Sequence, residues 1–209
     1  MPRSRVATDR FTLRAVPRPR VKPEDVLESI EKVARSQGLP IIGPIRGLLL
    51  DEVILKHRPA TVLEVGTLVG YSAIRMGRHL KDSQTITCVE LRRDMAETAR
   101  SNITKAGLSD RIQVIVGDAK EVLPSLKGSV DMVFFDAVKE DYIVYLRSVE
   151  RLLHGGSVVV ADNVKSYAQE VKPYLDYVRN SGKYTSEYRE APPNFTPGAA
   201  DALEISVRL

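Results

Sequence analysis

Oxygen-bearing side chains follow two apolar stretches in the second half of the chain, where buried strands are expected to end. Asp136 comes directly after residues 130–135, and Asp162 and Asn163 follow residues 156–161. Two carboxylates and an amide oxygen are hard ligands, suited to Mg²⁺, which keeps waters and leaves positions for a substrate. Because the two strands are consecutive, we expect their ends to lie close together. The alternative interpretation makes Asp136 a helix cap and Asp162–Asn163 a turn.

A lysine lies close to the first of these acids in the sequence. Lys139 comes three residues after Asp136, at the start of an expected helix. An amine next to a metal site can take a proton from a metal-bound hydroxyl, which makes Lys139 a candidate general base. The alternative is a solvated lysine, which the helix dipole disfavours at that end of a helix.

A second group of candidate residues lies in and after residues 61–72. The stretch begins apolar and β-branched, turns at Gly66, and resumes at Gly70 with helical spacing, which predicts the opening strand and helix of a nucleotide-binding sheet. Its glycine spacing differs from the G-x-G-x-x-G pattern that holds a pyrophosphate. Glu90 ends the next expected strand, 24 positions after Gly66, about where such a fold binds ribose hydroxyls. Ribose binding without a phosphate cradle favours S-adenosylmethionine over NAD.

The elements that must position these residues alternate regularly. Strands are expected at 61–65, 85–90, 111–116, 130–135 and 156–161, and helices at about 70–80, 93–106, 119–126, 140–153 and 167–180. Unbroken apolar strands are typical of a parallel sheet covered on both faces. Two further strands, 185–189 and 202–208, are joined by a loop at 192–198 and predict an antiparallel hairpin. The predicted fold is therefore α/β, Rossmann-like and doubly wound, with a mostly parallel seven-stranded sheet, an antiparallel C-terminal hairpin and helices on both faces.

Acidic residues recur at the expected carboxyl ends of the strands, where ligands of open α/β sheets bind. Carboxylates are costly to bury there unless they bind a ligand or a cation. These positions are Glu64, Glu90, Asp118, Asp136 and Asp162 with Asn163.

The N-terminal region is expected to contain a basic arm followed by two helices. Residues 1–22 hold seven basic residues against one acid, a net charge of +6, whereas the whole chain carries +4, so residues 23–209 carry −2. The arm could contact RNA, an acidic partner or an anionic surface, or be a solvated or dimer-wrapping terminus. Pro23 predicts a helix start and Gly38 its end, and a second helix is expected at about 45–57. We expect residues 23–209 to form a single domain.

Composition limits the compartment and the remaining chemistry. The 209 residues contain one cysteine, Cys88, expected to be a buried thiol, and no apolar run near the roughly 20 residues that span a bilayer. No secretory signal is visible, so we expect a cytoplasmic protein without membrane association. His57, His79 and His154 lie near expected helix ends away from the motifs and are interpreted as structural.

The ordered set of motifs resembles a known family, the cation-dependent class I S-adenosylmethionine O-methyltransferases, which include the catechol and caffeoyl-coenzyme A O-methyltransferases. The resemblance covers about residues 36–209 and rests on the stretches 64–72, Glu90, 117–119, 136–139 and 161–163. Residues 136–142 resemble the caffeoyl-coenzyme A and bacterial branch, and residues 186–190 the catechol branch.

The resemblance implies a role for each matching position. The cofactor residues would be Ile42, Glu64, Gly66, Tyr71, Ser72, Glu90, Leu91, Gly117, Asp118, Ala119 and Asp136. Mg²⁺ would be bound by Asp136, Asp162 and Asn163, with Lys139 as general base and Glu187 orienting the second hydroxyl of a vicinal diol. The acceptor would contact Pro40, Val138, Lys139, Asn163, Tyr167, Glu187 and Tyr188.

The chain also departs from the catechol enzyme. It has no tryptophan, and Val138 stands where the catechol enzyme has an aromatic residue beside a histidine. We therefore expect a reshaped acceptor pocket and a small catechol-like aromatic diol as substrate. Two other hypotheses stay open: a tRNA hydroxyuridine O-methyltransferase that uses the basic arm, and a cofactor-binding module without catalysis. A homodimer is a further expectation, whereas nucleic-acid binding is disfavoured by the acidic body.

Overall fold

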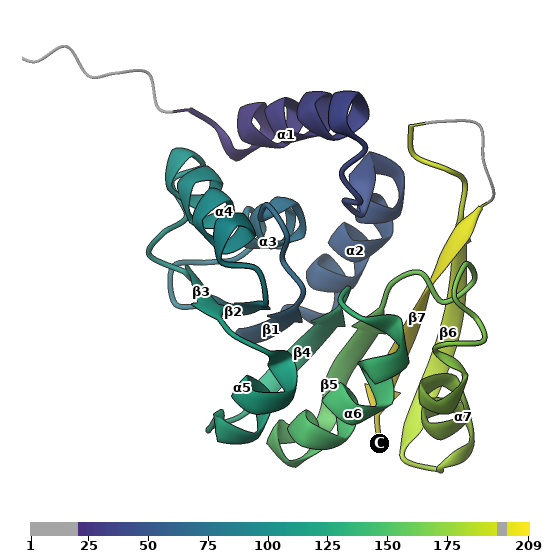
Figure 1. Ribbon diagram of the computed structural model, residues 1–209. Helices are drawn as coiled ribbons and strands as arrows, with labels where there is room; N and C mark the ends of the chain where they lie inside the picture. Colours follow the sequence, from purple (N-terminus) through teal and green to yellow (C-terminus); the bar gives the residue numbers. More distant parts are fainter. Residues whose placement is uncertain (1–20, 196–199) are drawn as a thin grey trace, which may run out of the picture.

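The structure is a computed structural model that describes residues 21–195 and 200–209. Residues 1–20 of the predicted arm and residues 196–199 of the predicted 192–198 loop lie outside the described residues. A seven-stranded sheet forms the centre of the molecule, in the order β3-β2-β1-β4-β5-β7-β6 (Figure 1). The strands are β1 (Thr61–Val65), β2 (Thr85–Glu90), β3 (Ile112–Val116), β4 (Val130–Phe135), β5 (Leu153–Ala161), β6 (Tyr184–Ala191) and β7 (Asp201–Arg208).

The strand directions confirm the predicted fold class. Strands β1 to β5 pair in parallel, and β7 pairs antiparallel with both β5 and β6. Phe135 is level with Ala161, and Ala161 is level with Glu204 on β7. Because β7 runs in the opposite direction, its first residue, Asp201, lies at the same edge of the sheet as the carboxyl ends of β4 and β5.

Helices cover both faces of the sheet, as predicted (Figure 1). Helices α2, α3 and α4 pack on one face, with α1 lying over α3 and α4, and helices α5, α6 and α7 pack on the other. Each layer encloses its own apolar cluster, because alternate strand residues point to opposite faces. The helices are α1 (Pro23–Gln37), α2 (Gly43–His57), α3 (Tyr71–Gly77), α4 (Arg93–Lys105), α5 (Ala119–Ser125), α6 (Tyr142–Val149) and α7 (Lys172–Asn180).

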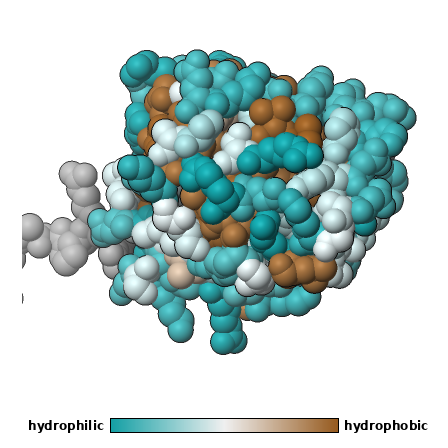
Figure 2. Space-filling view, turned by 90° about the horizontal axis from the view of Figure 1, so that it is seen from below, coloured by the Kyte–Doolittle hydropathy of each residue, from teal (hydrophilic) through white to brown (hydrophobic). Residues whose placement is uncertain are grey.

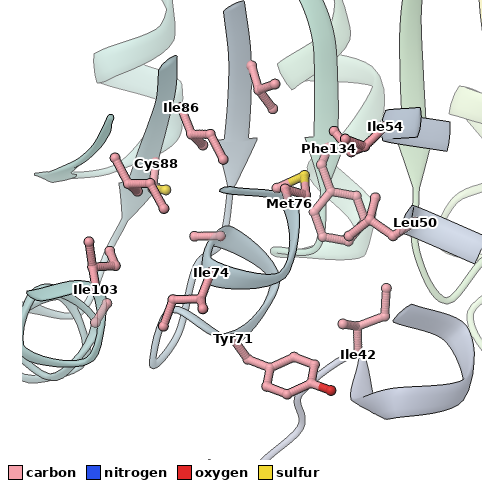
Figure 3. Packing of buried hydrophobic residues seen from close by; sticks show 14 of the residues in the cluster. Ile42, Leu50, Ile54, Tyr71, Ile74, Met76, Ile86, Cys88, Ile103 and Phe134 are labelled. Carbon is pink, nitrogen blue, oxygen red and sulfur yellow. The ribbon is translucent and has the colours of Figure 1, made fainter. Parts of the chain in front are cut away.

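The apolar cluster beneath α3 and α4 contains the single cysteine. Cys88 lies among Ile86 and Ile103 (Figure 3) and is fully buried. Burial raises the pKa of its thiol well above the usual value. The prediction of a buried thiol is confirmed.

Two predicted helices have different boundaries in the structure. The helix expected at 140–153 is replaced by a 3₁₀ turn (Lys139–Asp141), α6 and a second 3₁₀ turn (Glu150–Leu152), and Leu153 already belongs to β5. The helix expected at 167–180 begins only at Lys172. Pro173 lies in its first turn, which is the position that proline tolerates, because its ring would clash with a preceding helical turn.

Hydrophilic residues cover most of the face shown in Figure 2, with apolar residues visible between them. Within residues 21–195 and 200–209, every helix is too short or too polar to span a bilayer.

Candidate active site

A cavity of about 370 Å³ opens at the carboxyl ends of the strands, against β1, β2 and β4. Most of the predicted cofactor residues line it, and so do two predicted acceptor residues, Pro40 and Val138. Ile42 and Tyr71, which Figure 3 shows at one end of the apolar cluster, form part of its wall. The cofactor residues in the lining are Ile42, Gly66, Tyr71, Ser72, Glu90, Leu91, Gly117, Asp118, Ala119 and Asp136.

Gly66 allows the turn after β1 to approach β4 closely. Its φ is +88°, and a Cβ there would lie 2.5 Å from the carbonyl oxygen of Asp136. Any other residue would push these two strand ends apart, which would widen the floor of the cavity.

Glu90 connects the end of β2 to the turn after β1. Its Oε2 accepts hydrogen bonds from the backbone N–H groups of Thr67 (3.2 Å) and Leu68 (2.8 Å), and its Oε1 accepts one from Arg92 N (2.9 Å). The carboxylate therefore has a fixed orientation at the cavity wall, where its remaining lone pairs can accept hydrogen bonds from hydroxyls. Asp118 has a local role as well, because its side chain caps α5 through Lys120 N at 2.8 Å.

Glu64 lies beneath the cavity and does not line it. It is the fourth residue of the five in β1 and not a strand end, and it is fully buried. Its Oε1 accepts a hydrogen bond from the hydroxyl of Ser72, which is a lining residue. Burial raises the pKa of Glu64 to about 7 despite this hydrogen bond. The structure thus gives Glu64 a contact with a cavity residue, where the sequence predicted direct contact with the cofactor.

The two predicted metal-binding acids come together as expected. Asp136 and Asp162 directly follow the paired residues Phe135 and Ala161, and Asp162 is fully buried. Burial raises the pKa of both carboxyl groups, and the negative charge of Asp136 raises that of Asp162 further. Such a pair is stable as two anions only when cations lie beside it.

Two basic side chains supply that positive charge. Lys139 Nζ lies 2.9 Å from Asp136 Oδ1 and 2.9 Å from the hydroxyl of Tyr142, and its side chain is 12% exposed. Arg46, on α2, places Nε 3.0 Å from Asp162 Oδ1 and Nη2 3.2 Å from Oδ2. The alternative of a solvated Lys139 is therefore wrong, because its amine is held between an acid and a phenol.

Asn163 is fixed by a residue from the other end of the chain. Its φ is +63°, and its amide Nδ2 donates a 2.7 Å hydrogen bond to Asp201 Oδ2. The other oxygen of Asp201 accepts hydrogen bonds from the backbone of Lys165 and Ser166. Since the amide nitrogen is engaged, the amide oxygen of Asn163 is the atom available to a cation.

The donor atoms suit a hard divalent cation. Within the described residues, no group of three or more His, Cys, Asp and Glu side chains could hold a metal ion. Two carboxylates and one amide oxygen are nevertheless a sufficient set for Mg²⁺, which uses few protein ligands and keeps several waters. Asp136, Asp162 and Asn163 meet this requirement in chemical type.

The predicted acceptor residues divide into two groups. Tyr167 lies near the base, with its ring centroid 5.9 Å from Lys139 Nζ, and Val138 is half exposed beside the cavity. Glu187 and Tyr188 lie on β6, two strands beyond β5.

Glu187 lies two strands away from the metal-binding acids. It is level with Ile205 on β7, which is level with Val160 on β5, two residues before Asp162. The Glu187 side chain is 55% exposed and forms an ion pair with Arg189 at 3.6 Å, while the Tyr188 hydroxyl contacts Glu190. Neither residue lines the cavity, and the role of Glu187 in orienting the acceptor stays a prediction.

Two residues at the site escaped prediction. Asp201 could have been found, because the first residue of a terminal antiparallel strand shares an edge with the ends of the parallel strands. Arg46 had a weaker signal, a lone basic residue between Ile45 and Gly47 in an otherwise apolar stretch. The histidines are absent from the cavity lining, and His79 and His154 instead contact Asp51 (3.2 Å) and Asp131 (2.8 Å).

Comparisons with known proteins agree with this geometry. The sequence model of a family described as O-methyltransferase matches residues 26–177. Catechol O-methyltransferase B of Danio rerio is 35% identical over 195 residues, which cover 90% of this chain and 73% of that protein. Caffeoyl-CoA O-methyltransferase of Stellaria longipes is 30% identical over 145 residues, covering 66% of this chain and 60% of that protein.

A solved structure extends the agreement to the fold. The O-methyltransferase TomG of Streptomyces achromogenes, in complex with S-adenosylmethionine, has a TM-score of 0.79 and 26% sequence identity, covering 90% of this chain and 91% of that one. The chain therefore belongs to the family of S-adenosylmethionine-dependent O-methyltransferases that includes the catechol and caffeoyl-CoA enzymes.

Proposed function

We propose that this protein transfers a methyl group from S-adenosylmethionine to one hydroxyl of a small aromatic vicinal diol, with Mg²⁺ bound by Asp136, Asp162 and Asn163. The observation that carries the proposal is the buried acid pair, with Lys139 between it and Tyr142, at the margin of the cavity. A binding module without catalysis has no use for an amine held in this way.

The cavity would bind the methyl donor through residues that lie in fixed positions. Glu90, oriented by three backbone N–H groups, would accept hydrogen bonds from the ribose hydroxyls. Ser72, held by Glu64, and Asp136 would face the amino-acid part of the donor. S-Adenosylmethionine supplies a methyl group on a sulfonium sulfur, which leaves as a neutral thioether.

The acceptor would be bound beside this cavity, close to the acid pair. A bound Mg²⁺ would act as a Lewis acid that lowers the pKa of a chelated hydroxyl. Lys139 Nζ, in its neutral amine form, would accept the hydroxyl proton and become an ammonium, with Tyr142 and Asp136 fixing the amine. Pro40, Val138 and Tyr167 would contact the aromatic ring, and their positions would hold the oxygen in line with the methyl group.

The metal requirement gives a direct test. The purified protein is assayed with labelled S-adenosylmethionine against catechols, hydroxycinnamoyl thioesters and tRNA, in EDTA and again after excess Mg²⁺ is added. We expect methylation of a diol that falls to background in EDTA and returns with Mg²⁺. Full activity in EDTA would disprove the metal role, and methylation of tRNA alone would disprove the proposed acceptor.

A further inference from the structure

The guanidinium of Arg46 pairs with the carboxylate of Asp162, which the proposed function assigns to the divalent cation. Arg46 lies in the first turn of α2 and is only 12% exposed. It contacts both oxygens of Asp162, through Nε and Nη2, while Nη1 is 3.9 Å from Asp201 Oδ2. One arginine therefore reaches a proposed metal ligand and also the acid that fixes Asn163.

The contact between Arg46 and Asp162 has imperfect geometry. Nε is buried and close to Asp162 Oδ1, yet it makes no well-aligned hydrogen bond. Asp162 Oδ1 already accepts a 2.7 Å hydrogen bond from Asn163 N. Of the two close contacts to Asp162, only the one from Nη2 is a directed hydrogen bond, so the guanidinium does not form the bidentate pair that holds an arginine most strongly.

The position of Arg46 is set by contacts of α2 outside the site. Asn194 accepts a hydrogen bond from Ile45 N and donates one to Ile42 O, both at 2.7 Å. A Cβ on Gly47 would lie 2.5 Å from Arg75 Nε, which shows how closely α2 and α3 pack. The residues flanking Arg46 are thus held in place by contacts that do not involve the acid pair.

We propose that Arg46 is the resident counter-cation of the acid pair, which competes with the divalent cation for Asp162 and keeps metal affinity low. This inference rests on the proposed function, because the cation site is part of it. Without a metal, Arg46 and Lys139 together offset the repulsion between Asp136 and Asp162. When a divalent cation enters, Asp162 must exchange at least one guanidinium contact for the metal, and a positive charge beside the metal opposes binding.

The proposal predicts that removal of Arg46 strengthens metal binding. Mg²⁺ is titrated calorimetrically into the wild-type protein, Arg46→Gln and the control Arg189→Gln, without acceptor. Arg189 is an exposed cation that pairs with Glu52 on α2 and does not contact the acid pair. We expect Arg46→Gln to bind Mg²⁺ at least tenfold more tightly, and the control to bind as the wild type does.

Thermal unfolding gives a second readout that does not depend on activity. Without metal, Arg46→Gln should melt at a lower temperature than wild type, and Mg²⁺ should raise its melting temperature more. Arg46→Lys keeps the positive charge but loses the two-pronged guanidinium, so its melting temperature and its Mg²⁺ response should lie between those of wild type and Arg46→Gln. It also serves as the test variant if Arg46→Gln does not fold.

The outcomes separate this inference from the function on which it rests. If wild type binds Mg²⁺ and the Arg46 variants bind it equally or more weakly, the competition is disproved while the metal site stands. If neither wild type nor variants bind Mg²⁺, the metal site itself is wrong and the inference fails with it.

Discussion

The cofactor half and the acceptor half of the ligand-binding edge are built differently. Most of the cofactor half, at the ends of β1 to β3, comes from one continuous part of the chain, and Glu90 is held there by backbone N–H groups. The acceptor half combines α2, β4, β5 and the start of β7, and ion pairs hold it: Arg46 with Asp162 and Lys139 with Asp136.

Backbone geometry determines the cofactor half, whereas charge determines the acceptor half. A turn that needs Gly66 and a carboxylate fixed by amides gives a cavity whose shape depends little on ionic state. Buried acids next to buried cations give a site whose state depends on which cation is present. We therefore expect charge substitutions to affect the acceptor half strongly and cofactor binding little.

The largest expected effect follows from removing the amine at the acceptor half. Lys139→Met should lower kcat by about 10²- to 10⁴-fold, the usual contribution of a general base. Calorimetry should show that S-adenosylmethionine still binds, which would separate the two halves. Lys172→Met, at an exposed ion pair on α7, is the matched control. A loss of kcat below tenfold would remove Lys139 from the role of base.

Glu64, a buried acid of the cofactor half, should show itself in the pH dependence of stability. Burial raises the pKa of Glu64 in the folded protein to about 7, against 4.5 for an exposed glutamate. The resulting stabilisation is fully present below pH 4.5 and is lost as pH rises through about 7, amounting to about 3 kcal/mol.

Urea unfolding between pH 5 and pH 8 measures this dependence. Wild type should lose more stability over that interval than Glu64→Gln, which carries no titrating group at this position. The exposed Glu97→Gln serves as control and should follow wild type. Equal pH slopes for wild type and Glu64→Gln would mean that Glu64 is not held as a neutral acid.

The sequence predicted the cofactor half better than the acceptor half, for a physical reason. Gly66 and Glu90 belong to consecutive elements, so their spacing along the chain fixes their separation in the sheet. Arg46 reaches Asp162 from 116 residues away and Asp201 reaches Asn163 from 38 residues away, and no local pattern encodes such contacts.

The position of Glu187 also depends on contacts between distant parts of the chain. The hairpin itself was predicted correctly, but the register that puts Glu187 level with Ile205 depends on the geometry of the connection between β6 and β7. The predicted helix starts near 140 and 167 were wrong. A 3₁₀ turn precedes α6, and Pro173 lies in the first turn of α7, and hydrophobic periodicity detects neither feature.

The smallest expected effect concerns the contact that joins the two halves. Asn194, after β6, caps the start of α2, which carries Ile42 at the cofactor cavity and Arg46 at the acid pair. Asn194→Ala removes both hydrogen bonds and should lower the free energy of unfolding by about 1 kcal/mol, as for loss of a helix cap. The exposed Asn180→Ala, at the end of α7, is the control.

The same variant tests whether the halves are mechanically connected. Because α2 would lose its anchor, the KM for S-adenosylmethionine and the affinity for Mg²⁺ should both shift by a few-fold, while Asn194→Asp should keep the acceptor for Ile45 N and recover part of the loss. A shift in only one of the two quantities would show that α2 positions one half alone. In that case the two halves respond independently, although α2 carries residues of both.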